Sequence, residues 1–243
     1  MAKRSPRRAK APRSTPPTGP TLPPNATDRA KAIHGLMSLL AEHPWIEISL
    51  ADIAERAGLS LAQLRTEFGS PLAILAAFIK DIDRQVLTDA PQAAEDAEES
   101  PRDRLFEVLM RRLEILTPYK EAIGSLLHSA RRNPPLAFAL NGLGVQSQQW
   151  MLTAAGINAN GPKGMIRAQG LALAYANVLR TWLDDDETDM ARTMAALDRA
   201  LAAGQRWSGF LDDLCCIPEQ LARLRRHRRD RYRRRDEEDV EAA

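Results

Sequence analysis

Residues 49–68, SLADIAERAGLSLAQLRTEF, decide the fold expected for the first part of the chain. Ser49 is a helix-capping residue, and Asp52 stands three positions later, where a carboxylate completes a capping box. Gly58 supplies the left-handed backbone that commonly ends a helix. Ser60 and Gln63 then repeat the capping pattern at the start of a second short helix. Two short helices joined by a glycine-containing turn are typical of the helix-turn-helix motif, whose second helix enters the DNA major groove.

The same periodicity also fits an ordinary helical hairpin in a bundle, so the flanking sequence matters. A helix is expected over 28–42, before the aromatic turn HPWIEI at 43–48. Its inward face is expected to hold Ile33, Leu36, Met37 and Leu40. Ser70 and Pro71 begin another helix, because proline is favoured at the first helical position. That helix is expected to run to about residue 88, with an inward face made by Leu72, Leu75, Ile79, Ile82 and Val86.

This order of elements resembles the DNA-binding domain of TetR-family transcriptional regulators. The positions that match the family's pattern are Pro44, Trp45, Ser49, Leu50, Ile53, Ala54, Ala57, Gly58, Ser60, Leu64, Phe68, Ser70 and Leu75. The resemblance implies a repressor that binds double-stranded DNA through an N-terminal three-helix domain. It also implies a C-terminal helical bundle that binds a small apolar ligand and pairs two chains into a homodimer through its last long helices.

The remainder of the chain predicts more helices, which makes the fold class all-α. An acidic stretch after residue 88 marks a domain boundary, and no alternating apolar run predicts a strand. Pairs of a capping or turn residue and proline then recur, and each pair begins a helix. The expected helices lie near 101–116, 118–131, 134–155, 163–183, 189–203 and 205–216. The expected organisation is a disordered basic tail (1–26), a helix-turn-helix domain with its connecting helix (27–88), a ligand-binding and dimerisation bundle (100–217) and an Arg-rich, then acidic tail (218–243).

Charge is unevenly distributed along the chain, whose formal net charge is +2. Residues 1–13 carry +6, residues 223–243 carry +3, and the stretch between them therefore carries −7. Residues 28–68 alone carry −2. Because phosphate neutralisation supplies most non-specific DNA affinity, the motif is expected to bind weakly without the basic tails. Glu67 and Pro71 add to this, since they stand where the family usually has phosphate-contacting residues.

The expected DNA contacts divide into base readers and phosphate binders. Leu61, Ala62 and Gln63 begin the second helix of the motif, where apolar groups suit thymine methyls and Gln suits adenine. Phosphates are expected to be held by Ser49, Ser60, Arg65 and Thr66. In the bundle, the aromatic candidates for the ligand site are Tyr119, Trp150, Tyr175 and Trp182. Small residues such as Ala168, Gly170, Ala172 and Ala176 favour close helix–helix packing.

A second resemblance gives an alternative function. Pro118-Tyr119, residues 150–157 and residues 173–199 are similar to lipid-binding accessory proteins of ubiquinone biosynthesis, which share a TetR-like fold. That resemblance implies an isoprenoid lipid in the bundle and a membrane surface as partner, reached through an apolar stripe (Trp207, Phe210, Leu211, Leu214) and the Arg-rich tail. The sequence shows no catalytic motif, so we expect no enzyme activity and no cofactor. No metal site is expected because Cys215 and Cys216 are adjacent. Lacking a secretion signal, the protein is expected in the cytoplasm.

Overall fold

The computed structural model describes residues 22–88, 100–187 and 189–204, and all regular structure in these ranges is helical. The all-α prediction is therefore confirmed for this part of the chain. Most of the basic N-terminal tail, nearly all of the acidic stretch, the helix expected at 205–216 and the Arg-rich tail lie outside the described residues.

The first four helices begin and end close to where the sequence predicts. They are α1 (Asp28–Glu42), α2 (Leu50–Ala57), α3 (Leu61–Glu67) and α4 (Pro71–Thr88). A 3₁₀ turn, Trp45–Glu47, stands between α1 and α2. Both predicted capping boxes are formed, by Ser49 with Asp52 and by Ser60 with Gln63. Gly58 ends α2 in the left-handed conformation, with φ of 65°.

The bundle begins with α5 (Pro101–Leu116), a 3₁₀ turn at Thr117–Tyr119 and α6 (Lys120–Arg132). It continues with α7 (Pro134–Ala154) and α8 (Gly161–Leu183), and residues 191–204 are again helical. The sequence placed the start of α8 at 163, two residues too late, because proline is tolerated within the first helical turn. Thr117-Pro118 begins a 3₁₀ turn rather than α6 itself.

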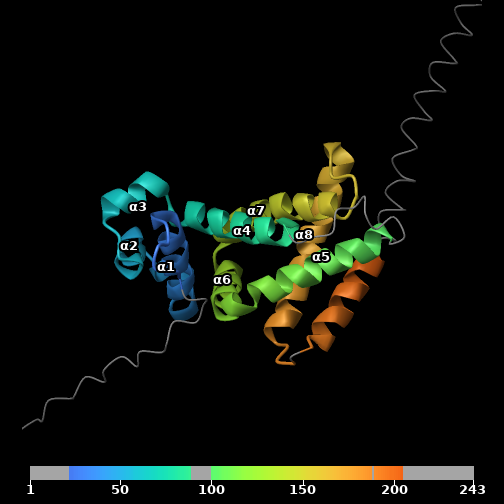
Figure 1. Cartoon of the computed structure of the whole chain (residues 1–243). Helices are drawn as coiled ribbons and strands as arrows, with labels where there is room; N and C mark the ends of the chain where they lie inside the picture. Colours follow the sequence, from blue (N-terminus) through green and yellow to red (C-terminus); the bar gives the residue numbers. More distant parts are fainter. Residues whose placement is uncertain (1–21, 89–99, 188, 205–243) are drawn as a thin grey trace, which may run out of the picture.

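One continuous hydrophobic core joins the helix-turn-helix to the bundle. Helix α1 packs against α2, α3, α4 and α6. Helix α4 extends from the helix-turn-helix end of the molecule into the bundle, where it packs against α5 and α7 (Figure 1). Helix α4 therefore contacts both the part that carries the motif and the bundle.

The buried face of α4 is wider than the sequence predicts. Ile74 and Phe78 are buried, although neither belongs to the predicted inward face. Leu72 and Ile79, which do belong to it, are only half-buried. The physical reason is that α4 is covered by α1 near one end and by α5 and α7 near the other, so its apolar stripe has to serve two directions.

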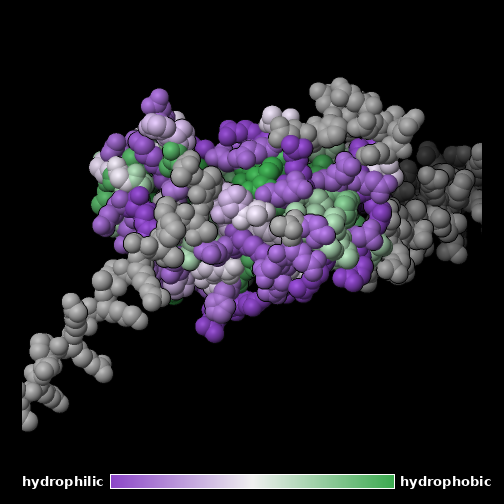
Figure 2. Space-filling view, turned by 60° about the horizontal axis from the view of Figure 1, so that its bottom comes forward, coloured by the Kyte–Doolittle hydropathy of each residue, from purple (hydrophilic) through white to green (hydrophobic). Residues whose placement is uncertain are grey.

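The face of the molecule shown in Figure 2 is mainly hydrophilic where its residues are described. Figure 2 shows one face on which green apolar patches lie in the middle of the body, surrounded by purple hydrophilic residues. Within the described ranges, each helix is too short or too polar to cross a lipid bilayer.

We predict that Gly58→Ala lowers the free energy of unfolding by about 1–2 kcal/mol, because a side chain is strained at positive φ even though the space around Gly58 is open. Urea denaturation measures the change. Gly124→Ala in α6 is the matched control, since its new methyl would make ordinary contact with Leu183 at 3.6 Å. That control is expected to gain about 0.5–1 kcal/mol from helix propensity. Equal effects of the two substitutions would contradict the left-handed assignment.

Candidate functional site

The outer face of α3 is open to solvent. Leu64 is the buried residue of this helix, and it is anchored in the core beside the buried Leu59 and Phe68 that flank α3. The other six residues of α3 are exposed, and the side chain of Leu61 is 58% accessible. The base readers and the α3 phosphate binders expected from the sequence, Leu61, Ala62, Gln63, Arg65 and Thr66, therefore share one short exposed helix.

Gln63 is held by the protein itself. Its Oε1 accepts hydrogen bonds from Ser60 N at 2.9 Å and Ser60 Oγ at 2.8 Å. Its Nε2 donates to Asp28 Oδ2 on α1 at 3.1 Å. The sequence assigned Gln63 two roles, as a cap and as an adenine reader. The structure shows it as a cap that also ties α3 to α1, and pairing with adenine would require these bonds to break.

The other polar candidates on the motif are also engaged locally. Ser49 Oγ donates to Asp52 Oδ2 at 2.6 Å, and the backbone N–H of Ser49 donates to the same oxygen at 2.8 Å. These two bonds hold the pKa of the Asp52 carboxyl below its usual value. Thr66 Oγ1 donates to the carbonyl of Ala62 at 3.0 Å. A hydroxyl can still accept or donate one further bond. These exposed hydroxyls therefore keep some capacity for a phosphate, but less than the sequence alone indicates.

Three of the four cationic side chains in residues 28–68 are paired with carboxylates of that segment or of α4. Arg29 donates to Asp81 on α4 at 2.7 Å, and Lys31 lies 3.1 Å from Asp28. Arg56 makes a two-pronged pair with Glu42, at 2.9 and 2.7 Å. The hydrogen bond from Arg56 lowers the pKa of Glu42, so the pair is charged at neutral pH.

Arg65 is the fourth cation, and it differs from the other three. Within the described residues no hydrogen bond or ion pair engages its guanidinium. It projects from α3 near Gly69, at a position that is exposed. Glu67, two residues later, is also exposed, and Pro71 is the first residue of α4. Arg65 is therefore the side chain of the motif best placed to meet an external anion, with Glu67 opposing it.

The four aromatic candidates in the bundle differ in their surroundings. Tyr119 packs edge-on against Phe78 of α4, with ring centroids 4.8 Å apart. Trp182 is buried, with Lys120 Nζ 5.8 Å from its ring, whereas Trp150 is 56% exposed. Tyr175 is buried beneath the guanidinium of Arg112, at 5.7 Å. A spacing pattern identifies aromatic residues as core-forming, but it does not show which of them meet in space.

Sequence reasoning missed a buried polar cluster in the bundle. Asp83 of α4 pairs with Arg112 of α5, and both residues are more than nine-tenths buried. Ser147 of α7 accepts from Arg112 and donates to Asp83 at 2.8 Å. A signal was present in the sequence, because Asp83 and Arg112 interrupt apolar positions at helical spacing, a pattern that marks a buried charge.

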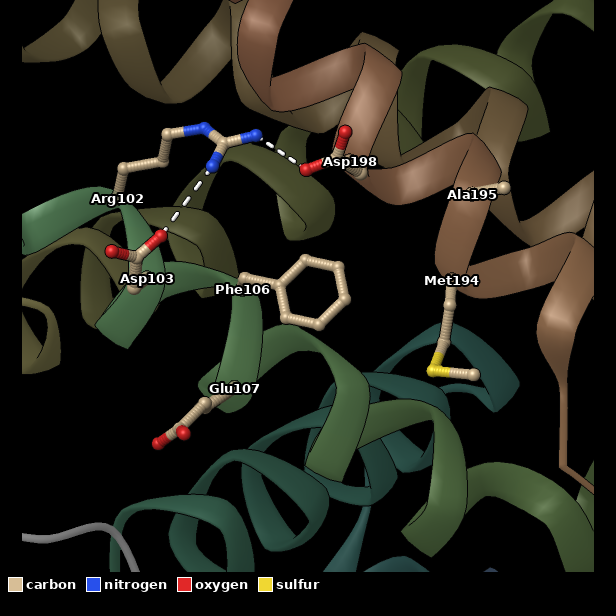
Figure 3. Close-up of a pocket in the computed structure, with 7 residues that line it drawn as sticks. All are labelled: Arg102, Asp103, Phe106, Glu107, Met194, Ala195 and Asp198. Carbon is tan, nitrogen blue, oxygen red and sulfur yellow. Dashed lines mark hydrogen bonds and ion pairs between the residues drawn. The ribbon is translucent and has the colours of Figure 1, made fainter.

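An open hollow of about 430 Å³ lies between the start of α5 and the helix at 191–204 (Figure 3). Its lining residues are Arg102, Asp103, Phe106, Glu107, Met194, Ala195 and Asp198. Arg102 pairs with Asp103 on its own helix and with Asp198 on the helix at 191–204, as the dashed lines in Figure 3 show. The second pair bridges the two helices. None of the four predicted aromatic residues lines this hollow.

Helices α7 and α8 carry exposed apolar side chains on their outer sides. On α7, Phe138 is 82% exposed and Trp150 is 56% exposed. On α8, Met165, Ile166 and Leu173 are about half exposed. Of the predicted small residues, Ala168 is fully buried and Ala172 lies near Gly144 of α7, whereas Gly170 opens to empty space. The small-residue seam therefore serves the α7–α8 contact in part.

We predict that Ser60→Ala and Gln63→Ala each lower the free energy of unfolding, Ser60→Ala by about 1 kcal/mol, because each removes half of the capping box that begins α3. Urea denaturation of the two single variants and the double variant forms a cycle. The double variant is expected to lose less than the sum, since both substitutions break the same box. Strict additivity would show that the two side chains act independently.

Comparison with known proteins was made for the sequence and for the fold. No protein-family model and no curated protein sequence matches the chain. Among solved structures, a TetR transcriptional regulator from Nitrosomonas europaea aligns with a TM-score of 0.57 at 19% identity, covering 74% of this chain and 99% of that one. A TetR transcriptional regulator from Rhodococcus sp. RHA1 aligns at 0.51 and 20% identity, covering 73% and 94%. A putative TetR-family regulator from Syntrophomonas wolfei aligns at 0.52 and 14%, covering 74% and 94%. The chain therefore has the fold of the TetR transcriptional regulators.

Proposed function

We propose that this protein is a dimeric DNA-binding transcriptional repressor whose DNA affinity is controlled by a small molecule bound in its helical bundle. The observation that carries the proposal is the presentation of α3, six of whose seven residues face solvent while Leu64 anchors the helix. The fold shared with solved TetR transcriptional regulators supports the same function.

In the proposed complex with DNA, the exposed residues of α3 would make different kinds of contact. Leu61 and Ala62 would face the methyl groups of thymines in the major groove. Arg65 would reach a phosphate or a guanine, for which its forked guanidinium is suited. Ser49, Ser60 and Thr66 would assist at phosphates through the bonding capacity that their local partners leave free. Gln63 would contribute to recognition mainly by fixing the angle of α3 against α1.

The charge arrangement predicts moderate affinity that depends on salt. Three cations of the motif are already paired, so few phosphates can be neutralised by the folded domain itself. The +6 segment at residues 1–13 would supply further phosphate contacts. Each contact contributes about −0.9 to the slope of log K against log salt concentration.

The apolar outer sides of α7 and α8 would form the dimer interface. Phe138, Trp150, Met165, Ile166 and Leu173 are large apolar side chains exposed on two neighbouring helices. A contiguous exposed apolar surface marks an association site, whereas scattered single residues do not, so the proposal requires these five side chains to form one patch. A two-fold dimer would set the two copies of α3 about 34–36 Å apart, which matches one turn of DNA.

We predict that Arg65→Ala weakens binding to duplex DNA by about 1–3 kcal/mol, because it removes the unpaired cation of α3. Fluorescence anisotropy at several salt concentrations measures the effect. Arg56→Ala is the matched control: it removes the same net charge from the same domain, but Arg56 is already paired with Glu42. The control is therefore expected to change binding much less.

The same titration with anionic vesicles separates the repressor from the lipid-binding alternative. If the protein is a repressor, it binds duplex DNA and Arg65→Ala weakens this binding, whether or not the protein also binds vesicles. Duplex binding that is equally unaffected by both arginine substitutions would reject α3 as the recognition helix. Vesicle binding without any duplex binding would favour the membrane-surface protein.

We predict that Phe138→Glu converts the dimer to a monomer, because it places a charge in the proposed apolar interface. Light scattering coupled to size-exclusion chromatography measures the mass. Ile46→Glu is the matched control, since Ile46 is also 82% exposed but lies beside the helix-turn-helix, far along the chain from α7. A variant carrying Phe138→Glu that stays dimeric would move the interface elsewhere.

A further inference from the structure

The buried cluster formed by Asp83, Arg112, Ser147 and Tyr175, hereafter the acid cluster, joins four helices. Asp83 lies on α4, Arg112 on α5, Ser147 on α7 and Tyr175 on α8. All four residues are more than nine-tenths buried. Arg112 binds Asp83 and Ser147 through the same nitrogen and lies over the ring of Tyr175.

Two hydrogen-bond donors of the acid cluster have no partner. They are Arg112 Nε and the hydroxyl of Tyr175, both fully enclosed by the protein. Burial raises the pKa of Tyr175, an effect that the neighbouring Arg112 partly offsets, so the phenol stays protonated and keeps its donor. Buried donors without acceptors are costly and uncommon in folded proteins. Their presence beside a guanidinium indicates that a further acceptor is missing.

We propose that the acid cluster recognises the carboxylate of a small organic acid with an apolar body. This deepens the proposed function by giving the chemical class of the effector, and it rests on that function only for the effect on DNA. A carboxylate offers two acceptor oxygens, which match the two unused donors, and it is the group that a guanidinium binds best. The protein's own Asp83 already shows that a carboxylate fits against Arg112.

The residues around the acid cluster indicate what the rest of the bound acid is like. Buried apolar residues stand one helical turn from its members, namely Val86 on α4, Leu109 and Leu116 on α5, and Leu171 and Val178 on α8. Such neighbours favour an apolar body attached to the carboxylate. The proposed effector is therefore an organic acid with an apolar body, which narrows the small apolar ligand that the sequence indicated.

Binding of the acid would act on α4. An incoming carboxylate that binds Arg112 Nε and the Tyr175 hydroxyl would draw the guanidinium away from Asp83, and an Asp83 without its partner would remain buried and charged unless α4 moved. Helix α4 also packs against α1, and Arg29 of α1 is bonded to Asp81 of α4. The acid would therefore favour a position of α4 that differs from the described one, and with it a different position of α3.

Chemical rescue of Asp83→Ala tests the acid cluster directly. This substitution removes a carboxylate about the size of formate and leaves Arg112 without its acidic partner. Thermal unfolding of the full-length variant is measured with sodium formate, formamide or sodium chloride at equal concentration. We expect formate to raise the melting temperature by about 2–4 °C above the chloride value, and formamide not to do so. The wild type should show a smaller rise, because Asp83 already occupies one nitrogen of Arg112. Equal effects of formate and chloride on the variant would overturn the proposal.

A second variant keeps the test decisive if Asp83→Ala does not fold. Tyr175→Phe removes the hydroxyl that lacks an acceptor, so we expect its melting temperature without any added acid to exceed that of the wild type. A lower melting temperature would show that the hydroxyl already has a partner, which overturns the proposal. Neither measurement uses DNA. If both melting-temperature results are as expected but the protein binds no duplex DNA, the repressor function is rejected and the proposal for the acid cluster still stands.

Discussion

The simultaneous packing of α4 against two partners is the constraint on which the rest of the structure depends. Helix α4 packs on α1 and also on α5 and α7, within one continuous core. The Arg29–Asp81 pair strengthens the first contact, and the buried Asp83–Arg112 pair fixes the second. Because Asp81 and Asp83 are two residues apart, the helix-turn-helix part and the bundle are linked through less than one helical turn.

The use of charge in the motif bears on the proposed DNA binding. Arg29, Lys31 and Arg56 neutralise neighbouring carboxylates, which fixes the relative positions of α1, α2 and α4. Little positive charge is then left for phosphates, apart from Arg65 and the basic segment at residues 1–13. A domain that relies on few phosphate contacts needs a small change in geometry, rather than a large one, to lose its DNA.

Local rules predicted the elements well, and tertiary contacts account for what they missed. The two capping boxes and Gly58 were correct because caps depend on residues three positions apart. The burial of Ile74 and Phe78 was missed, since it depends on which helices cover α4. The acid cluster brings together four residues from four helices, and no local pattern pairs Asp83 with Arg112. Likewise, the exposure of Trp150 and the burial of Trp182 follow from packing that single-helix spacing cannot show.

Selection of bound duplexes from a random-sequence pool tests the central claim most directly, because it requires no knowledge of the natural DNA site. Two copies of α3 related by a two-fold axis predict that the enriched sequences form an inverted repeat, with half-site centres about 10 base pairs apart. Recovery of a pool with no sequence enrichment, even at low salt concentration where binding is strongest, would contradict the assignment of α3 as a DNA-reading helix.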